Sequence, residues 1–278
     1  MATLTGAAQL ALLGSYTPDT TSAGVTIYTV DGQKYEFIDD FVPGSDYLVV
    51  ADGTSRVFLN DTTGSSIIVG NDDIYLNAEG SNGGNKIIVG NGNNELWLSN
   101  GNDAVRVGQG NNIINAGAGD DTITAGNGNN TIVSGDGNDV VRVGNGNNTI
   151  DTSGNSVSDR DVVIVGNGNN QIITGQGEDT VKVMGNGAGN NRIDTGTGND
   201  NISLAAGTGV DTIVKGSVSG EIDTVTGFDT AHDKIAQAAS TVSSTVISGN
   251  DTVVTFSDGS QVVLVGVQIA DSSSFLVS

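Results

Sequence analysis

Cysteine is absent from the 278 residues, and the chain has only 2 Pro and 1 His. Without cysteine the protein has no disulfide framework and no thiolate metal site. A single histidine removes most acid–base pairs and catalytic triads, and the sequence has no H-E-x-x-H zinc motif, no G-x-S-x-G nucleophile elbow and no P-loop. These absences predict that the protein is not an enzyme.

Bulky side chains and positive charges are also scarce. Aromatic residues make up 4% of the chain, Gly numbers 42, and 10 basic residues face 32 acidic ones, for a formal net charge of −22. So little bulk favours an elongated, thin-cored architecture over an ordinary globular core. The few Lys and Arg look dispersed, which argues against nucleic acid and anionic membrane surfaces as partners. The acidic excess instead predicts that a cation neutralises the chain.

Long hydrophobic runs are missing as well. No run approaches the roughly 18 apolar residues of a transmembrane helix. No Lys or Arg precedes Lys34, so the N-terminus lacks the charged region of a secretory signal. We therefore expect a soluble protein without a cleaved N-terminal leader.

A nine-residue repeat fills most of the chain from Ser81 onward, with the form G-x-G-N-(N or D)-x-(I or V)-x-x. Its glycines permit tight turns with positive φ, and the residues around Ile or Val form a short strand with an inward side chain. Two repeats make one coil, which must stack on its neighbours through parallel strand pairing to bury its apolar face. The repeat predicts an all-β fold, a right-handed parallel β-roll or β-solenoid with small β caps at both ends.

One slot of this repeat alternates between Asp and Asn. Because two repeats close one coil, alternation in sequence becomes segregation in space, with an Asp column along one edge and an Asn column along the opposite edge. The carboxylate slots are Asp103, Asp121, Asp139, Asp161, Asp179, Asp200 and Asp223, and the amide slots between them are Asn94, Asn112, Asn130, Asn148, Asn170 and Asn191.

The repeat resembles the calcium-binding nonapeptide of the RTX (repeats-in-toxin) family, G-G-x-G-x-D-x-U-x with U a large apolar residue. The resemblance spans about Ser81 to Asp223. It departs from the consensus where the first Gly is replaced, as by Val107, and where the acidic slot is Asn. Calcium is the cofactor that this resemblance implies, and six to eight oxygens from Asp carboxylates and glycine-turn carbonyls suit it. The expected turn glycines are Gly101, Gly119, Gly137, Gly177 and Gly198.

The alternative to a metal site is that Asp and Asn only form turns. Turn preference alone would not sort the two residues by parity, so we expect calcium along the Asp edge. The uncharged Asn column should stack through amide hydrogen bonds, as in cross-β ladders, with weak or no calcium binding. Whether Asp211 binds metal stays open.

Four segments follow from these patterns. Residues 1–50 are expected to form an N-terminal β segment, a cap or an assembly contact that holds most of the aromatics. Residues 51–80 have the pattern of degenerate, metal-free repeats, residues 81–223 that of an RTX β-roll, and residues 224–278 that of a C-terminal β cap with a secretion signal.

The C-terminal segment predicts a β-hairpin with Asp258 and Gly259 at its turn. The chain ends in "DSSSFLVS", which resembles the uncleaved export signal of type I secreted RTX proteins; an ordinary final strand is the alternative. The resemblance implies export by the type I secretion machinery of a Gram-negative bacterium. We therefore expect an extracellular or cell-surface protein that is exported without an N-terminal signal peptide.

A chain that is almost entirely solenoid favours a structural role. We expect a secreted calcium-dependent protein that self-assembles into an extracellular layer, matrix fibre or filament, because terminal coils offer unpaired strand edges and a head-to-tail contact that does not close builds a fibre. Its partner is then itself, as a homopolymer. The alternative is a monomeric adhesive or ligand-binding module, for instance for cell-surface polysaccharide. An ice-binding face would need a regular Thr or Asn rank, which Ile113 and Val140 interrupt.

Overall fold

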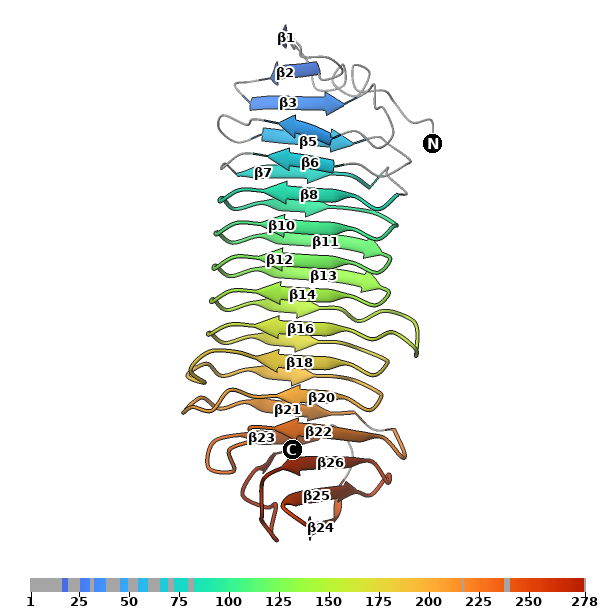
Figure 1. The fold of residues 1–278 in the computed structure, drawn as a ribbon, viewed down its shortest axis with the longest axis vertical. Helices are drawn as coiled ribbons and strands as arrows, with labels where there is room; N and C mark the ends of the chain where they lie inside the picture. The colour runs from blue at the N-terminus through green and yellow to red at the C-terminus, as the bar shows by residue number, and fades with distance from the viewer. Residues whose placement is uncertain are drawn as a thin grey trace.

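The computed structural model describes residues 73–79, 83–216, 218–237 and 241–277 in full, and before residue 73 only the backbone of six strands. Its fold is all-β, a parallel β-solenoid of about 8 turns, which confirms the predicted fold class. The strands stack as successive coils along the long axis (Figure 1). The described residues form no helix, so none of them supplies an apolar helix long enough to cross a membrane.

Two sheets make up the solenoid, and successive strands alternate between them from β3 to β24. Sheet A has 14 strands. They are β1 (Thr17–Asp19), β2 (Thr26–Val30), β3 (Gln33–Ile38), β5 (Ser55–Leu59), β7 (Ile74–Asn77), β9 (Glu95–Trp97), β11 (Ile113–Ala118), β13 (Thr131–Asp136), β15 (Thr149–Asp151), β17 (Gln171–Ile173), β19 (Arg192–Asp194), β21 (Thr212–Lys215), β23 (Lys234–Gln237) and β27 (Leu276–Val277).

Sheet B has 13 strands. They are β4 (Asp46–Val49), β6 (Ser66–Val69), β8 (Lys86–Val89), β10 (Ala104–Val107), β12 (Thr122–Ala125), β14 (Val140–Val143), β16 (Val162–Val165), β18 (Thr180–Val183), β20 (Asn201–Ser203), β22 (Ile222–Thr226), β24 (Val242–Ser248), β25 (Asp251–Phe256) and β26 (Gln261–Val265).

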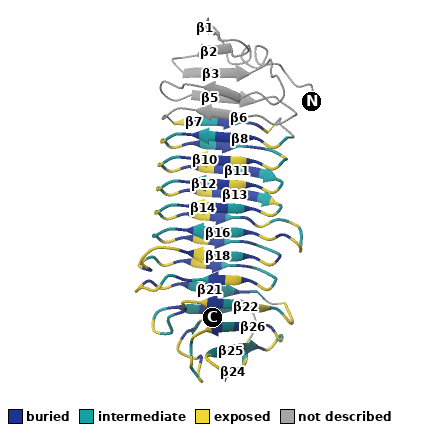
Figure 2. Cartoon of the chain, in the orientation of Figure 1, coloured by how far each residue is buried: buried dark blue, intermediate teal, exposed yellow. Residues whose placement is uncertain are grey.

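The core is built from stacked inward rows of aliphatic side chains, two of them in sheet B. Ile114 and Ile132 pair in register in sheet A, and Ile123 and Val141 do so in sheet B, each at most 1% exposed. Because side chains alternate across a strand, the residues between them face out, and buried and exposed segments alternate along the described coils from β7 onward (Figure 2). Burying one such side chain stabilises the fold by about 1.5–3 kcal/mol, and every coil adds further side chains of this kind.

The C-terminal end is an antiparallel cap. Strand β25 pairs with β24 and β26, and β26 continues sheet B by pairing in parallel with β22. The predicted hairpin is confirmed, with Gly259 at φ +88° in its turn. Phe275 is fully buried with its ring 5.3 Å from that of Phe228, and β27 pairs with β23. The last residues thus form a final strand, and their role in export stays a prediction.

Parallel stacking begins earlier than residue 51. Strand β3 pairs in parallel with β5, and β4 with β6, so residues from Gln33 onward already contribute strands to the two sheets. The side chains before residue 73, including the N-terminal aromatics that were expected to form a cap or contact, lie outside the described residues.

The basic residues are less dispersed than the sequence suggested. Four exposed cations, Lys86, Arg106, Arg142 and Lys182, lie on the outer face of sheet B, on β8, β10, β14 and β18. From β8 to β20 the outward positions of this sheet carry no carboxylate. None of the four forms a salt bridge with another described residue. We call this surface the basic face.

Candidate metal site

The structure places the alternating slots on opposite edges of the solenoid, as two separate inward columns. The seven predicted carboxylates follow one another at 18 to 23 residues along the chain, each at most 2% exposed. The six predicted amides form the second column, each at most 3% exposed. Short strands fix both columns, because every slot except Asp223, which lies inside β22, comes directly before a strand, and the strands stack in register.

The Asn column is fully hydrogen-bonded. The Nδ2 group of Asn112 donates to Oδ1 of Asn130 at 2.8 Å and to the carbonyl oxygen of Gly110 at 3.0 Å. The backbone N–H of Asn112 donates to the same Oδ1 at 3.3 Å. The same three contacts recur at Asn94, Asn130, Asn148 and Asn170. These amides join neighbouring coils without any ion.

The Asp column keeps only part of this pattern. Each backbone N–H donates to Oδ1 of the next Asp, for example at 2.7 Å from Asp103 to Asp121 and at 2.8 Å from Asp121 to Asp139. Asp has a second oxygen, Oδ2, where Asn has its Nδ2 amide group. An ionised carboxylate cannot donate a hydrogen bond from this oxygen. The Oδ2 atoms of five members are buried without a hydrogen-bond partner: Asp103, Asp121, Asp139, Asp179 and Asp200.

Burial makes ionisation of these carboxyls unfavourable. Desolvation, with added repulsion from Asp139 and Asp103, raises the pKa of Asp121 to about 8. Burial likewise raises the pKa of Asp103 to about 6 and those of Asp161 and Asp200 to about 7. A stack of buried carboxyls spaced at about 4.8 Å therefore needs either protons or cations.

Glycine turns bring carbonyl oxygens to the same edge. Gly101, Gly119, Gly137, Gly177 and Gly198 each precede a column Asp by two residues, the position whose carbonyl accepts the amide in the Asn column. Gly137 has φ +128°, and a Cβ atom there would clash with the carbonyl oxygen of Gly119 in the coil before. The turns of successive coils therefore stack so closely that only glycine fits at this position. A larger side chain would push the coils and their carbonyl oxygens apart.

This donor set fits a hard cation. It consists of carboxylate and carbonyl oxygens, which suit Ca²⁺ rather than a transition metal. The described residues hold no group of three or more His, Cys, Asp or Glu side chains able to bind a metal ion by themselves. Backbone carbonyls must therefore complete the coordination. The unpartnered Oδ2 atoms are the carboxylate oxygens that would face a bound cation.

We expect Gly137→Ala to lower both stability and calcium affinity. The left-handed backbone alone costs about 1–2 kcal/mol for alanine, and the clash with Gly119 adds to that. Gly220→Ala is the matched control, since its φ is +87° and nothing lies within 4 Å of its added Cβ. Thermal unfolding and calorimetric calcium titration measure both effects. Equal losses in the two variants would show that close stacking of the turns is unimportant.

A column of small polar residues, not foreseen from the sequence, borders the Asp column. Ser134, Thr152, Thr174 and Thr195 occupy one inward slot in successive coils of sheet A, at most 1% exposed. Thr152 Oγ1 donates to Oδ2 of Asp161 at 2.7 Å. The signal was present in the sequence, as a hydroxyl residue two positions after each of Ile132, Ile150, Ile172 and Ile193.

The remaining predicted sites fall at the end of the stack. Asp211 lies in the Asn column, since its Oδ1 accepts from the Nδ2 of Asn191 at 2.7 Å and its own N–H donates to Asp233 at 3.0 Å. Asp223 ends the Asp column, and its Oδ2 lies 3.1 Å from the Nζ of Lys215. The structure thus brings six carboxyls into like environments and gives the seventh a cationic neighbour.

Comparisons with known proteins match these repeats. A model of the RTX calcium-binding nonapeptide repeat (4 copies) matches residues 79–114, 107–141, 115–150, 157–182 and 187–213. No curated protein matches the chain. Among solved structures, the extracellular lipase LipA from Serratia marcescens is 17% identical with a TM-score of 0.33, over 74% of this chain and 40% of that chain. The match thus spans less than half of the lipase.

Repeats of this family bind Ca²⁺, and proteins that carry them are typically secreted. The ladder of Asp slots, the turn glycines with positive φ and the parallel coils are the features that such a repeat requires. Across residues 79–213, the chain carries the calcium-binding nonapeptide repeats of the RTX family.

Proposed function

We propose that the protein is a secreted structural solenoid whose coils are joined by Ca²⁺ along the Asp column. The observation that carries this proposal is the row of buried Oδ2 atoms without partners. Calcium would supply the positive charge that this edge lacks. The residues that would hold it are the carboxylates of Asp103, Asp121, Asp139, Asp161, Asp179 and Asp200 and the carbonyls of Gly101, Gly119, Gly137, Gly177 and Gly198.

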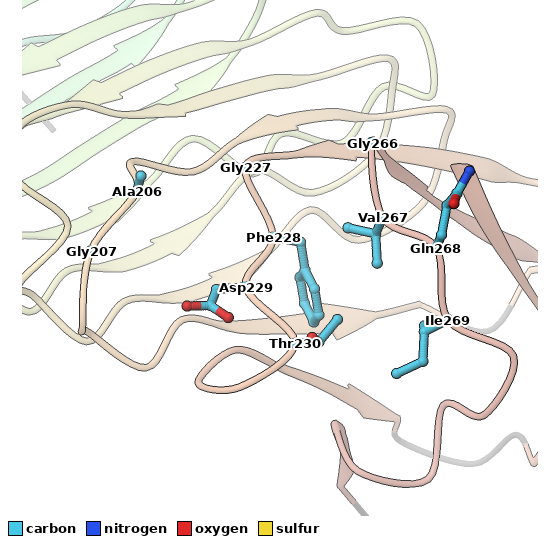
Figure 3. A pocket seen from close by; sticks show the side chains of 10 residues that line it. All are labelled: Ala206, Gly207, Gly227, Phe228, Asp229, Thr230, Gly266, Val267, Gln268 and Ile269. Atoms are coloured by element: carbon cyan, nitrogen blue, oxygen red, sulfur yellow. The ribbon is translucent and has the colours of Figure 1, made fainter. Parts of the chain in front are cut away.

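A pocket lies beside the C-terminal cap. This pocket of about 500 Å³ lies between the turns that follow β22 and β26, with Phe228, Val267 and Ile269 among its lining residues (Figure 3). Its carboxylate, Asp229, is 2.8 Å from Nδ1 of His232 on an exposed turn. No hydroxyl among the described residues is hydrogen-bonded to this histidine, so the contact between nucleophile and base that acyl transfer needs is missing.

Self-assembly is the second part of the proposal, and an open sheet edge supports it. Strand β24 is the outermost strand of sheet B at the C-terminal end. Its Val246 and Ile247 are 54% and 45% exposed. An exposed strand edge with apolar side chains is a template for pairing with another chain. Pairing with the opposite end of a second copy leaves the contact open, and repetition then builds a filament. Secretion would place this assembly outside the cell.

The test compares assembly with and without calcium. We expect fibres or layers by electron microscopy, and a rise in light scattering, in millimolar Ca²⁺ but not in EDTA. The double variant Val246→Lys, Ile247→Lys should fold and bind calcium yet stay monomeric, because charged edges resist pairing. Val157→Lys is the control, since Val157 is 77% exposed in a turn far from β24. Wild-type protein that stays monomeric at high concentration in calcium would overturn self-assembly.

The basic face supports the alternative, a monomeric module that binds an anionic polysaccharide. Its four cations are exposed, and the outward positions of β8 to β20 offer them no carboxylate. In a chain of net charge −22, such a face is an isolated region of positive charge that attracts a polyanion. Retention of monomeric protein on an acidic polysaccharide, lost in Arg106→Ser and Arg142→Ser together, would favour this function over assembly.

A further inference from the structure

One buried lysine lies at the end of the Asp column. The side chain of Lys215 is 2% exposed, and its Nζ lies 3.1 Å from Oδ2 of Asp223 and 3.4 Å from Oε2 of Glu221. Lysine is almost never fully buried unless it is paired, because an uncompensated ammonium in the interior is strongly unfavourable. The ammonium and the two carboxylates therefore depend on one another.

The position of Lys215 repeats that of the hydroxyl residues in earlier coils. In the register of β19 and β21, Asp194 pairs with Val214, so Thr195 and Lys215 occupy the same slot in successive coils. Two coils before Thr195, Thr152 in this slot donates to Oδ2 of its neighbouring Asp. Lys215 contacts the same carboxylate oxygen, Oδ2, of Asp223. In the last coil a charged donor therefore replaces a neutral one.

The turn before Asp223 differs from most of the other turns as well, although the coil of Asp161 also has an acid, Asp159, at the corresponding position. Glu221 stands two residues before Asp223, where five earlier coils have Gly. Its Oε1 accepts from the backbone N–H of Gly198 at 2.9 Å, and its Oε2 faces the ammonium. Asp223 is not among the column members whose Oδ2 lacks a partner. The last coil thus contains its own cation and a second carboxylate to hold it.

We propose that the Lys215 ammonium is a built-in counter-ion that takes the place of the last calcium ion. Calcium then binds from Asp103 to Asp200, and no ion binds at Asp223, because the ammonium already contacts its Oδ2. The final coil and the cap built on β22 then need no calcium at Asp223, because the ammonium offsets one of the two carboxylate charges there. They form a folded platform on which the remaining coils order as ions bind. This inference rests on the proposed placement of calcium in the Asp column.

Reciprocal exchange of the slot residues tests the proposal in the full-length chain. Lys215→Thr with Glu221→Gly gives the last coil the residues of the earlier coils, and its calcium stoichiometry should rise by one ion. Thr195→Lys moves an ammonium one coil earlier, and its stoichiometry should fall by one. Lys182→Thr is the control, since this lysine is on the outer face, and its stoichiometry should equal that of wild type. Calorimetry and native mass spectrometry count the ions.

Hydrogen exchange of wild-type protein in chelator gives a second readout that needs no variant. Amides of β22, β25 and β26 should exchange more slowly than those of β10 to β16. The role of Lys215 would be overturned if the substituted proteins fold and bind as many calcium ions as wild type. It would also be overturned if the amides of both regions exchange hydrogen equally fast in chelator. If wild-type protein binds no calcium at all, the calcium column itself is overturned. The two failures are therefore distinguishable.

Discussion

A variant in which Asn replaces the first six members of the Asp column should fold in EDTA, whereas wild-type protein should lose most of its β structure there. The changed residues are Asp103, Asp121, Asp139, Asp161, Asp179 and Asp200. Each new amide can repeat the contacts of the Asn column, where Nδ2 donates to the next Oδ1 and to a glycine carbonyl. An unsatisfied buried polar atom costs about 1–3 kcal/mol, so the five unpartnered Oδ2 atoms together approach the roughly 5–15 kcal/mol stability of a whole domain. Far-ultraviolet circular dichroism in EDTA measures the difference.

The control for this experiment removes equal charge elsewhere. Replacing six exposed or half-buried acids with their amides leaves the Asp column intact, and this variant should still need calcium. Suitable positions are Asp120, Asp136, Asp151, Glu178, Asp194 and Asp271. Folding of the control in EDTA would mean that net charge, rather than the buried column, makes the chain dependent on calcium. An all-Asn variant that still binds several ions would show that the carboxylates are not the ligands.

In chelator, the stability of the protein should fall as pH rises. Burial raises the folded-state pKa of Asp103 to about 6 and of Asp121 to about 8, from an ordinary value near 3.8. Between pH 3.8 and about pH 8, the folded state therefore binds more protons than the unfolded state. The free energy of unfolding decreases as pH rises across that window. One pKa unit is about 1.4 kcal/mol, so the summed effect of the column is several kcal/mol. Far-ultraviolet circular dichroism in EDTA from pH 5 to pH 8.5, which follows the fraction of folded protein, measures it.

Calcium should reverse this dependence. The ion binds deprotonated carboxylates, so calcium affinity and the stability of the loaded protein should rise with pH over the same window. The all-Asn variant should show neither trend, since its column does not titrate. Stability in EDTA that increases from pH 5 to pH 8.5 would contradict the assignment of protons to buried column carboxyls.

The columns could be predicted from sequence because one letter alternates at a fixed spacing. Asp121, Asn130 and Asp139 need only the rule that two repeats close a coil, and the structure places them on two edges as that rule requires. Lys215 could not be found in this way. The lysine lies two positions after Ile213, as Thr195 lies two positions after Ile193, but the alternating slot carries no information on this position, and the contact of Lys215 with Asp223 is seen only in the folded coil.

The two ends depended on contacts that the repeat does not encode. The hairpin around Gly259 followed from turn chemistry, but the open edge of β24 depends on which strand is outermost in sheet B. The basic face was also hidden, because Arg106 and Arg142 are 36 positions apart in sequence. They lie two coils apart once β10, β12 and β14 stack in register.

The in-register columns also make molecular length an adjustable property. A segment such as residues 126–143 contributes one Asn slot, one Asp slot and one strand to each sheet, so a copy inserted in tandem meets the same neighbours on both sides. Each added coil would lengthen the rod by about 4.8 Å. Extra residues are accommodated at the turns, as between Asp139 and Asp161, which are 22 positions apart, whereas the slots of a regular coil are 18 apart. Duplication of a coil is therefore a route to rods of different reach.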